Sequence, residues 1–298
     1  DCDWSSDVCS SDLKDLPLLA MGIVGIGTSG PIIAASKMPI PTLIFWRNLG
    51  GTLLLLPFAL RAAEWRDAAA RKAMKIAALS GFFLGLHFLA FFAAMRYTTV
   101  ATGTALTCLQ PIFAALYVVL RGHLIPKRAW SGMVIAFASV LLITGFDLAI
   151  GVKYFFGDIA GILAGALAAA YMLAGSKAQR TISTATFAVI CYLTCAATAL
   201  LAGIMLKVQI WNFPKREWIL CGLLILGAQI LGHTMFNMSL KRVSPVVVSL
   251  IVFFEVPVSA FIAAIWLGQK PSNGIWPGLI GLLIGCAIFV TRNERNND

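Results

Sequence analysis

Residues 76–96 read IAALSGFFLGLHFLAFFAAMR, an apolar run in which Arg96 is the single charged side chain. About 20 apolar residues suffice for a helix to cross the hydrocarbon layer of a bilayer. Charge clusters and Pro or Gly breaks divide the rest of the chain into nine more runs of similar length. We therefore expect ten transmembrane helices with short connections and no separate soluble domain. The expected spans are 16–35, 40–60, 76–96, 98–120, 129–147, 158–176, 184–206, 217–240, 244–267 and 275–291.

The composition points to the same class of protein. Hydrophobic residues make up 59% of the 298 residues and charged residues only 12%, whereas soluble proteins carry about 25% charged residues. A lipid-embedded barrel is excluded because runs such as LLLLPFAL at 53–60 show no alternation of polarity. The net charge of +10 does not indicate a nucleic-acid partner in so apolar a chain. We predict an all-α integral membrane protein.

Residues 1–15 are set aside from the expected bundle. They contain five Asp and no apolar stretch of the kind that a signal peptide has. We interpret them as a non-native or disordered leader. The seven Cys show no metal-ligand or redox spacing, and we expect no metal and no cofactor.

The distribution of Lys and Arg predicts the orientation of the bundle. Fifteen of the 23 fall on the side that holds both termini, seven fall on the other side, and Arg47 lies inside a span. Cytoplasmic loops are enriched in Lys and Arg. We therefore expect both termini, including the tail 292–298, to be cytoplasmic in a multi-pass protein of the inner membrane.

An internal repeat appears at an offset of 146 residues. Without a gap, His87 aligns with His233, Arg96 with Arg242 and Pro111 with Pro257. Five spans separate equivalent positions, so the segment 158–291 is expected to be inverted relative to 16–147. Inverted halves are a recurring architecture of secondary transporters, in which the halves exchange shapes during alternating access. Because one chain holds both halves, we expect it to work as a monomer.

At 85–132 and 244–290 the sequence resembles the EamA-type ten-helix branch of the drug/metabolite transporter superfamily. The family's turn of Glu, Pro and Val before small residues is matched by Glu255, Pro257 and Val258, with Val256 inserted. Gln269 stands where the family often has Glu at a helix end, so a role of that acidic end is not expected here. The resemblance implies transport of small metabolites, commonly amino acids, without ATP hydrolysis. No P-loop motif occurs in the chain.

Ionisable residues inside spans mark candidate sites, because they are costly to bury in lipid. Arg47 would bind a substrate carboxylate or anchor neighbouring helices. His87 and His233, with Phe91 and Asn237 one turn further along, would line a central site or bridge helices as neutral imidazoles. Glu255 would carry a coupling proton, or be satisfied by the backbone or by Arg47.

Four further residues are candidates of a different kind. Pro111 and Pro257 would kink their spans and act in gating, since proline removes a helix hydrogen bond. Gln110, directly before Pro111, would contact substrate or brace that kink. Tyr171 and Trp46 would supply an aromatic wall, or face lipid or the core instead.

The function we predict is secondary transport of a small metabolite, such as an amino acid, most simply export. The alternative is an intramembrane enzyme or a lipid flippase with the same helix count, using the two His and the Glu. An enzyme would need a nucleophile–base pair or a metal cluster in the spans, which the two His and the Glu could in principle form and which metal analysis would test. We nevertheless do not expect an enzyme.

Overall fold

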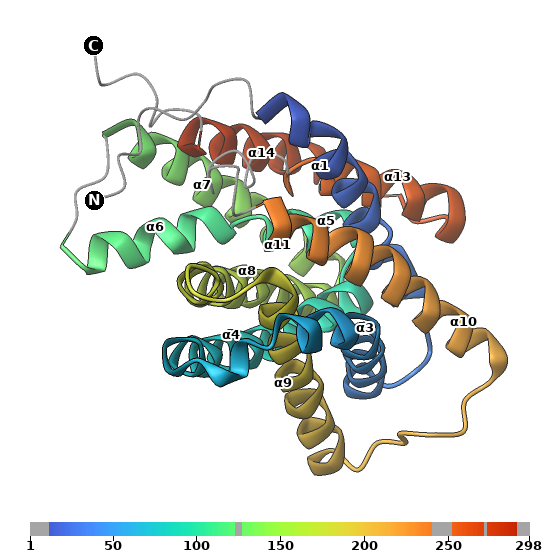
Figure 1. The fold of residues 1–298 in the computed structure, drawn as a ribbon. Helices are drawn as coiled ribbons and strands as arrows, with labels where there is room; N and C mark the ends of the chain where they lie inside the picture. Colours follow the sequence, from blue (N-terminus) through green and yellow to red (C-terminus); the bar gives the residue numbers. More distant parts are fainter. Residues whose placement is uncertain (1–11, 123–126, 240–251, 271–272, 291–298) are drawn as a thin grey trace.

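The structure is a computed structural model that describes residues 12–122, 127–239, 252–270 and 273–290. These residues form helices joined by short turns, without strands in the described ranges (Figure 1). The first half contains α1 (Asp12–Gly27), α2 (Ser29–Ala35), α3 (Ile40–Ala62), the 3-10 turn η1 (Glu64–Arg66), α4 (Ala68–Tyr97), α5 (Val100–Thr107), α6 (Gln110–Leu120) and α7 (Lys127–Ile150). The second half contains α8 (Val152–Gln179), α9 (Thr184–Met205), α10 (Lys215–Leu223), the π-helix η2 (Leu224–Thr234), α11 (Met235–Ser239), α13 (Glu255–Leu267) and α14 (Trp276–Val290).

The all-helical membrane architecture is confirmed. In the part of the chain that the structure describes, 7 helices are long and apolar enough to cross a membrane. Three shorter apolar segments, 20–35, 255–267 and 276–285, belong to the expected first, ninth and tenth spans. The leader 1–11 and the tail lie outside the described residues, and α1 begins at Asp12 rather than at 16.

Two expected boundaries move. α4 begins at Ala68 rather than 76, because the carboxylate of Asp67 accepts hydrogen bonds from the backbone N–H groups of Ala69 and Ala70 at 3.2 and 3.3 Å. Such a side-chain cap satisfies donors that a helix start leaves free. α7 ends at Ile150 and α8 starts at Val152. The two halves are therefore joined by Gly151 alone, and residues 148–150 and 152–157 are helical, where a loop was expected.

Four spans are interrupted or locally rewound. A turn at Thr28 separates α1 from α2, and a turn at Cys108–Leu109 separates α5 from α6. Another turn, at 253–254, directly precedes α13. The eighth span changes from α10 to the π-helix η2 and back to α11. π-Helical turns are rare and are frequent at functional sites.

Helix contacts follow the internal repeat. α4 packs on α9, and α5 and α6 pack on α8. Further contacts between the halves join α4 with α8, α3 with α9, α7 with α14, α5 with α13 and α1 with η2. Counted as spans these are 3–6, 2–7, 5–10, 4–9 and 1–8. The two halves can be exchanged by replacing each span with its equivalent five places away in the chain. This exchange converts the pair 3–6 into 8–1 and the pair 1–8 into 6–3. It leaves the pairs 2–7, 5–10 and 4–9 unchanged. The packing thus has the pseudo-two-fold relation expected of two inverted halves.

The contact between α1 and η2 depends on glycine. A Cβ atom on Gly25 would lie 2.7 Å from the backbone nitrogen of Gly232 and 2.8 Å from the carbonyl oxygen of Gly227. Glycine therefore lets the two backbones touch, as small residues do in membrane helix pairs. In α8, Gly161 and Gly165 allow a similar approach of α5.

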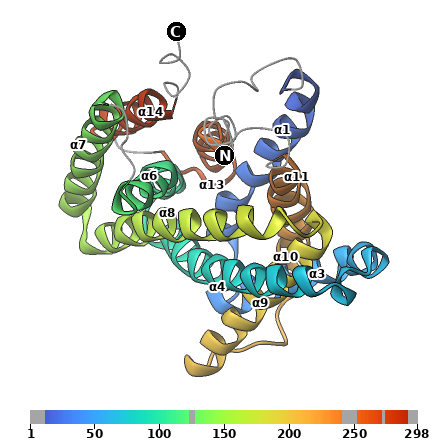
Figure 2. The ribbon, with the colours of Figure 1, turned by 60° about the vertical axis from the view of Figure 1, so that its left-hand side comes forward.

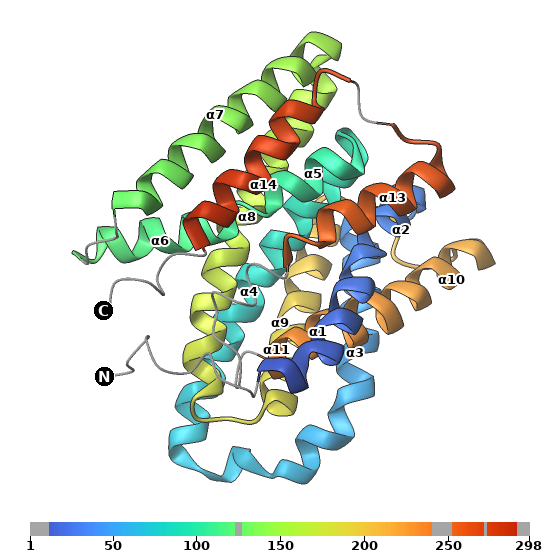
Figure 3. The same cartoon turned by 90° about the horizontal axis from the view of Figure 1, so that it is seen from above.

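The buried apolar residues form two clusters. One joins α2, α3, α4, α8, α9, α10 and η2, and the other joins α5, α7, α13 and α14. Figures 2 and 3 show α7 and α14 side by side at one edge, with α4 and α8 running together through the middle. Arg47, His87 and His233 lie on helices that form the first cluster.

Candidate functional site

Arg47 is buried completely in the middle of α3. Its Nε donates a hydrogen bond of 2.7 Å to Oε1 of Gln229, and Nε2 of Gln229 donates one of 2.9 Å to Oδ1 of Asn48. Both terminal nitrogens, Nη1 and Nη2, have no hydrogen-bond partner among the described residues. A buried polar group normally has a partner. Gln229 thus fixes one edge of the guanidinium while the opposite edge retains its hydrogen-bond donors.

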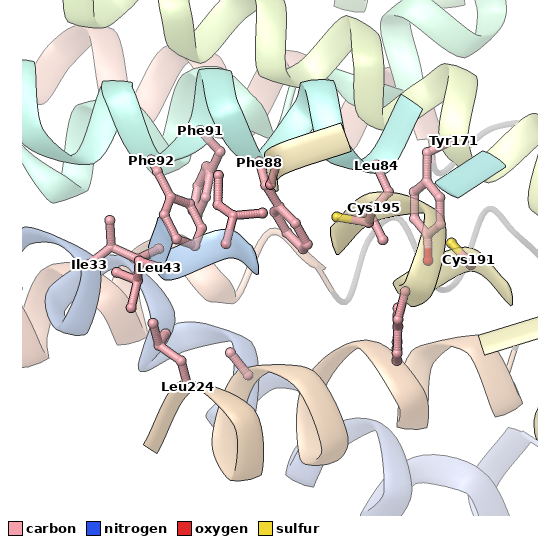
Figure 4. Packing of buried hydrophobic residues seen from close by; sticks show 14 of the residues in the cluster. Ile33, Leu43, Leu84, Phe88, Phe91, Phe92, Tyr171, Cys191, Cys195 and Leu224 are labelled. Carbon is pink, nitrogen blue, oxygen red and sulfur yellow. The ribbon is translucent and has the colours of Figure 1, made fainter. Parts of the chain in front are cut away.

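The ring of Phe88 is where the charged and imidazole groups meet. The Cζ atom of Arg47 lies 4.3 Å from its centroid. The imidazole of His87 lies 5.1 Å away and that of His233 lies 5.3 Å away, both measured between ring centroids. Figure 4 shows the Phe88 side chain extending from α4 toward the side of η2. A cation over an aromatic face is attracted by the ring's quadrupole, so this ring helps to hold Arg47.

The π-helix η2 supplies the polar residues that face α3 and α9. Gln229 contacts Arg47, and the hydroxyl of Thr234 donates to the carbonyl oxygen of Gln229 at 2.9 Å. Thr234 also lies 3.2 Å from the hydroxyl of Tyr192 on α9. Gln229 contacts Arg47 and His233 lies beside Phe88, so these two residues of η2 face the same group of side chains.

His87 and His233 both lie beside the ring of Phe88. Nδ1 of His87 lies 2.9 Å from the carbonyl oxygen of Ala164 on α8. A carbonyl only accepts, so Nδ1 carries the proton and a neutral His87 keeps Nε2 as an acceptor. His87 also stacks on Phe91 at 5.7 Å. This geometry suits a histidine that bridges α4 and α8 while it lies beside Arg47.

Tyr171 and Asn237 form a second polar contact. The hydroxyl of Tyr171 on α8 donates to Oδ1 of Asn237 on α11 at 2.9 Å, and both residues are buried. Nδ2 of Asn237 has no partner in the described part of the chain. The amide N–H groups of Asn237 are therefore without a partner among the described residues, and Tyr171 lies near Cys191 (Figure 4).

Glu255 is the first residue of α13 and is partly buried. It and Arg47 interact electrostatically, although they form no direct ion pair within the residues described. The two prolines follow the helix interruptions: Pro111 is the second residue of α6 and Pro257 the third of α13. Gln110 donates to the sulfur of Met172 on α8 rather than to the Arg47 group.

Trp46 lies apart from the other candidates. Its Nε1 donates to the carbonyl oxygen of Ile210 at 2.9 Å, and its ring meets Trp211 and Trp218 edge-on. At the same end of the bundle, Glu217 of α10 accepts hydrogen bonds from the hydroxyl of Ser36 and from the N–H groups of Lys37 and Met38. Glu217 thereby ties the α2–α3 turn to α10.

Several residues of this region were not predicted. Phe88 and Gln229 stand beside the predicted His87 and His233 in chain or space, yet a Phe in an apolar run gives no distinguishing signal. The carboxylates of Asp147 and Asp158, both fully buried, were also missed, because each lies at the end of an expected span. No group of three metal-ligating side chains occurs among the residues described.

Taken together, the residues around Phe88 can bind an anion. Arg47 presents the two nitrogens of a guanidinium edge, which match the two oxygens of a carboxylate. His87, beside the same ring, keeps Nε2 as an acceptor, and Glu255 interacts electrostatically with Arg47. The free guanidinium edge of Arg47 is thus the part of this group that suits an anionic ligand.

Comparison with known proteins gives a consistent family. The model of the EamA-like transporter family matches twice, over residues 16–145 and 155–291. An uncharacterized transporter of Archaeoglobus fulgidus is 31% identical over 133 residues, which cover 42% of this chain and 45% of that protein. The match thus spans less than half of the curated relative. A solved structure titled only as the crystal structure of a protein is 18% identical with a TM-score of 0.64, covering 96% of this chain and 100% of that one. It supports the fold.

Proposed function

Since the chain belongs to the EamA-like transporter family, we propose that it is a secondary transporter for small carboxylate-bearing metabolites, amino acids or related compounds. Transport would proceed outward across the cytoplasmic membrane by alternating access of the two inverted halves. The family and the transporter-named relative point to a membrane transporter and not to an enzyme. The substrate class, the direction and the inner-membrane location with cytoplasmic termini are our proposals.

The observation that carries the substrate class is the hydrogen bonding of Arg47. Burial of a guanidinium is costly, and Arg stays charged under ordinary conditions. The side chain is nevertheless fully buried, held through Nε by Gln229 and over the ring of Phe88, with Nη1 and Nη2 unpaired. A structural anchor would use these terminal donors on neighbouring helices. Their orientation instead supports binding of a substrate carboxylate.

The symmetric packing supports alternating access. In an inverted pair, each contact between halves has a counterpart, so the two halves can exchange conformations without loss of packing. The contacts of α4 with α8 and of α1 with η2 are such counterparts. Arg47, His87 and His233 lie between them, and a substrate there would be reached from either side in turn.

The test is flux in proteoliposomes with Arg47 variants. We expect wild-type protein to move one or more members of a panel of amino acids and other carboxylates, and Arg47→Ala to lose transport. Removing one partner of a buried charge pair costs about 2–5 kcal/mol, so the apparent affinity should fall at least ~30-fold. Arg47→Lys should restore only part, since Lys cannot bind a carboxylate through two nitrogens.

Arg61→Ala is the matched control, because Arg61 lies on the same helix but is exposed. It should leave transport unchanged. Unaltered flux in folded Arg47→Ala protein would overturn the proposed role. Movement of a labelled lipid instead of any carboxylate would favour the flippase alternative. Flux driven by inward and outward substrate gradients, compared in oriented vesicles, tests the direction.

A further inference from the structure

A pair of carboxylates lies outside the Arg47 group, where the two halves of the chain join. Asp147 is in the last turns of α7 and Asp158 in the second turn of α8. Both are fully buried. Within the described residues the hydroxyl of Thr98, in the turn between α4 and α5, donates to Oδ2 of Asp147 at 3.1 Å.

The remaining oxygens of the pair lack hydrogen-bond partners. Oδ1 of Asp147 and both carboxylate oxygens of Asp158 are buried and unpaired among the described groups. The two side chains nevertheless interact directly with each other. Buried carboxylate oxygens that accept no hydrogen bond make the charged form costly. These three oxygens therefore indicate that the pair binds a cation, either a proton or a metal ion.

No positively charged side chain among the described residues acts on the pair. From α4, Arg96 extends to the carbonyl oxygen of Met38 and interacts with Glu217, and Tyr97 is exposed. From α8, Lys153 lies in the exposed first turn, with Tyr154 beside it. The described parts of α5 and α14 contribute no charged side chain. The groups that act on the pair are the two carboxyls themselves and Thr98.

We propose that Asp147 and Asp158 form a binding site for one exchangeable proton, and that this proton is the coupling ion of transport. Two adjacent carboxylates cannot both stay ionised when water is excluded, so they share a proton. Uptake of H⁺ from water forms one O–H bond and changes the total charge of the pair from −2 to −1. Release returns the proton to water and restores −2.

The position of the pair explains how its charge would affect the fold. α7 ends the first half, α8 begins the second, and Gly151 alone separates them. A Cβ on Gly157, directly before Asp158, would lie 2.5 Å from the backbone nitrogen of Thr98. A second negative charge would repel Asp158 of α8 from Asp147 of α7, and the close approach of Gly157 to Thr98 restricts the movement of α8 at this point. The doubly charged state requires the helices to separate and admit water.

Proton binding is measured directly by infrared difference spectroscopy on the full chain in detergent, without any substrate. We expect a carbonyl-stretch band of a protonated carboxyl that titrates in wild type and is lost in both Asp158→Asn and Asp147→Asn. Asp67→Asn is the matched control, because Asp67 only caps α4 at an exposed position. Thr98→Val should shift the band rather than remove it.

Several outcomes would overturn the proton site. The titrating band could persist in folded Asp158→Asn and Asp147→Asn protein and vanish in Glu255→Gln, which would assign it to Glu255. Alternatively, sodium could displace the proton at constant pH, which would make the pair a metal-cation site. Because Asp→Asn could also disturb folding, each variant is compared by thermal unfolding, and the two single variants must agree.

The coupling of the proton to substrate transport rests on the proposed function, whereas proton binding by the pair does not. In proteoliposomes, an imposed pH gradient should accelerate wild-type flux, and Asp158→Asn should abolish that acceleration while substrate binding persists. Retained acceleration in Asp158→Asn would overturn the coupling role. If no substrate moves in wild type but the band titrates through the pair, the proton site stands and the proposed transport function fails.

Discussion

Phe88 shows how one apolar side chain organises a charged group. It is buried, and its ring contacts Arg47, His87 and His233 from three different helices. Nothing in its sequence context distinguishes it from Phe82 or Phe83, since all belong to one apolar run. Arg47 and the histidines could be predicted because ionisable groups are rare in spans. The ring that holds them could not, because its role depends on contacts between distant helices.

Phe88→Leu tests this role. Leucine keeps the apolar character but removes the ring face, and a buried cation–π contact contributes about 0.5–2 kcal/mol. We expect the apparent affinity for the transported carboxylate to fall by about 2- to 30-fold, measured by flux at varied substrate concentration. Phe187→Leu is the control, because Phe187 is equally buried but packs near Gly175. An equal loss in both variants would contradict a specific role of Phe88.

The burial of Asp147 and Asp158 was also not predicted from the sequence. Asp147 and Asp158 are eleven positions apart, at the ends of two expected spans, where an acidic residue is ordinarily solvated. The helices extend past those ends, which places both residues inside the bundle. The error lay in the boundaries, since apolar runs predict the number of spans better than their ends.

At the scale of helices, some interruptions of the spans can be predicted from the sequence and others cannot. The turns before Pro111 and Pro257 follow from the missing proline N–H. The π-helical winding of η2 has no such signal, since LILGAQILGHT contains neither proline nor an insertion that marks it. It depends on partners outside the segment, among them Arg47 and Asn48 on α3. Packing thus decides the winding that the local sequence leaves open.

Glu217 provides a test at this scale. Its carboxylate accepts from the backbone N–H groups of Lys37 and Met38 at 2.9 and 3.2 Å. Glu217→Gln keeps a neutral acceptor but removes the charge. The charge supplies roughly half of the strength of such a hydrogen bond, so the variant should lose about 1 kcal/mol. Hydrogen exchange at residues 37 and 38 should therefore quicken about fivefold.

Glu64→Gln is the matched control for Glu217→Gln. Glu64 accepts from the backbone N–H and the hydroxyl of Ser183, which caps α9 in the turn that follows α8. This variant should quicken exchange at residue 183 and leave residues 37 and 38 unchanged. Equal effects of the two variants at both places would show general loosening and not the local tie that the structure contains.

At the scale of the molecule, the sequence predicts the ten spans, their inversion and the family, because each rests on many residues. The pairing of spans 3–6 with 8–1 was not predicted in detail, since it depends on where small residues permit contact. Gly25 against Gly232 and Gly157 against Thr98 are two such contacts, one in each counterpart pair.

These two glycines give a prediction for the whole bundle. Gly25→Ala would loosen the contact of α1 with η2, and Gly157→Ala that of α8 with the end of α4. Overpacking of this kind costs about 1–3 kcal/mol, so both variants should unfold at lower temperature. Gly222→Ala is the control, because Gly222 lies in α10 with nothing within 4 Å of an added Cβ.

Which conformation each glycine variant favours depends on the inverted relation of the two halves. If the two contacts are counterparts, loosening one favours the conformation open to one side, and loosening the other favours the opposite conformation. Residues 37–38 are held by Glu217 and residue 183 by Glu64. The rate of hydrogen exchange at each of these two places should then rise in one glycine variant and fall in the other. Changes of the same sign in both, relative to Gly222→Ala, would contradict an exchange of shapes between the halves. A bundle whose halves moved together would give that result, because both ends would loosen at once.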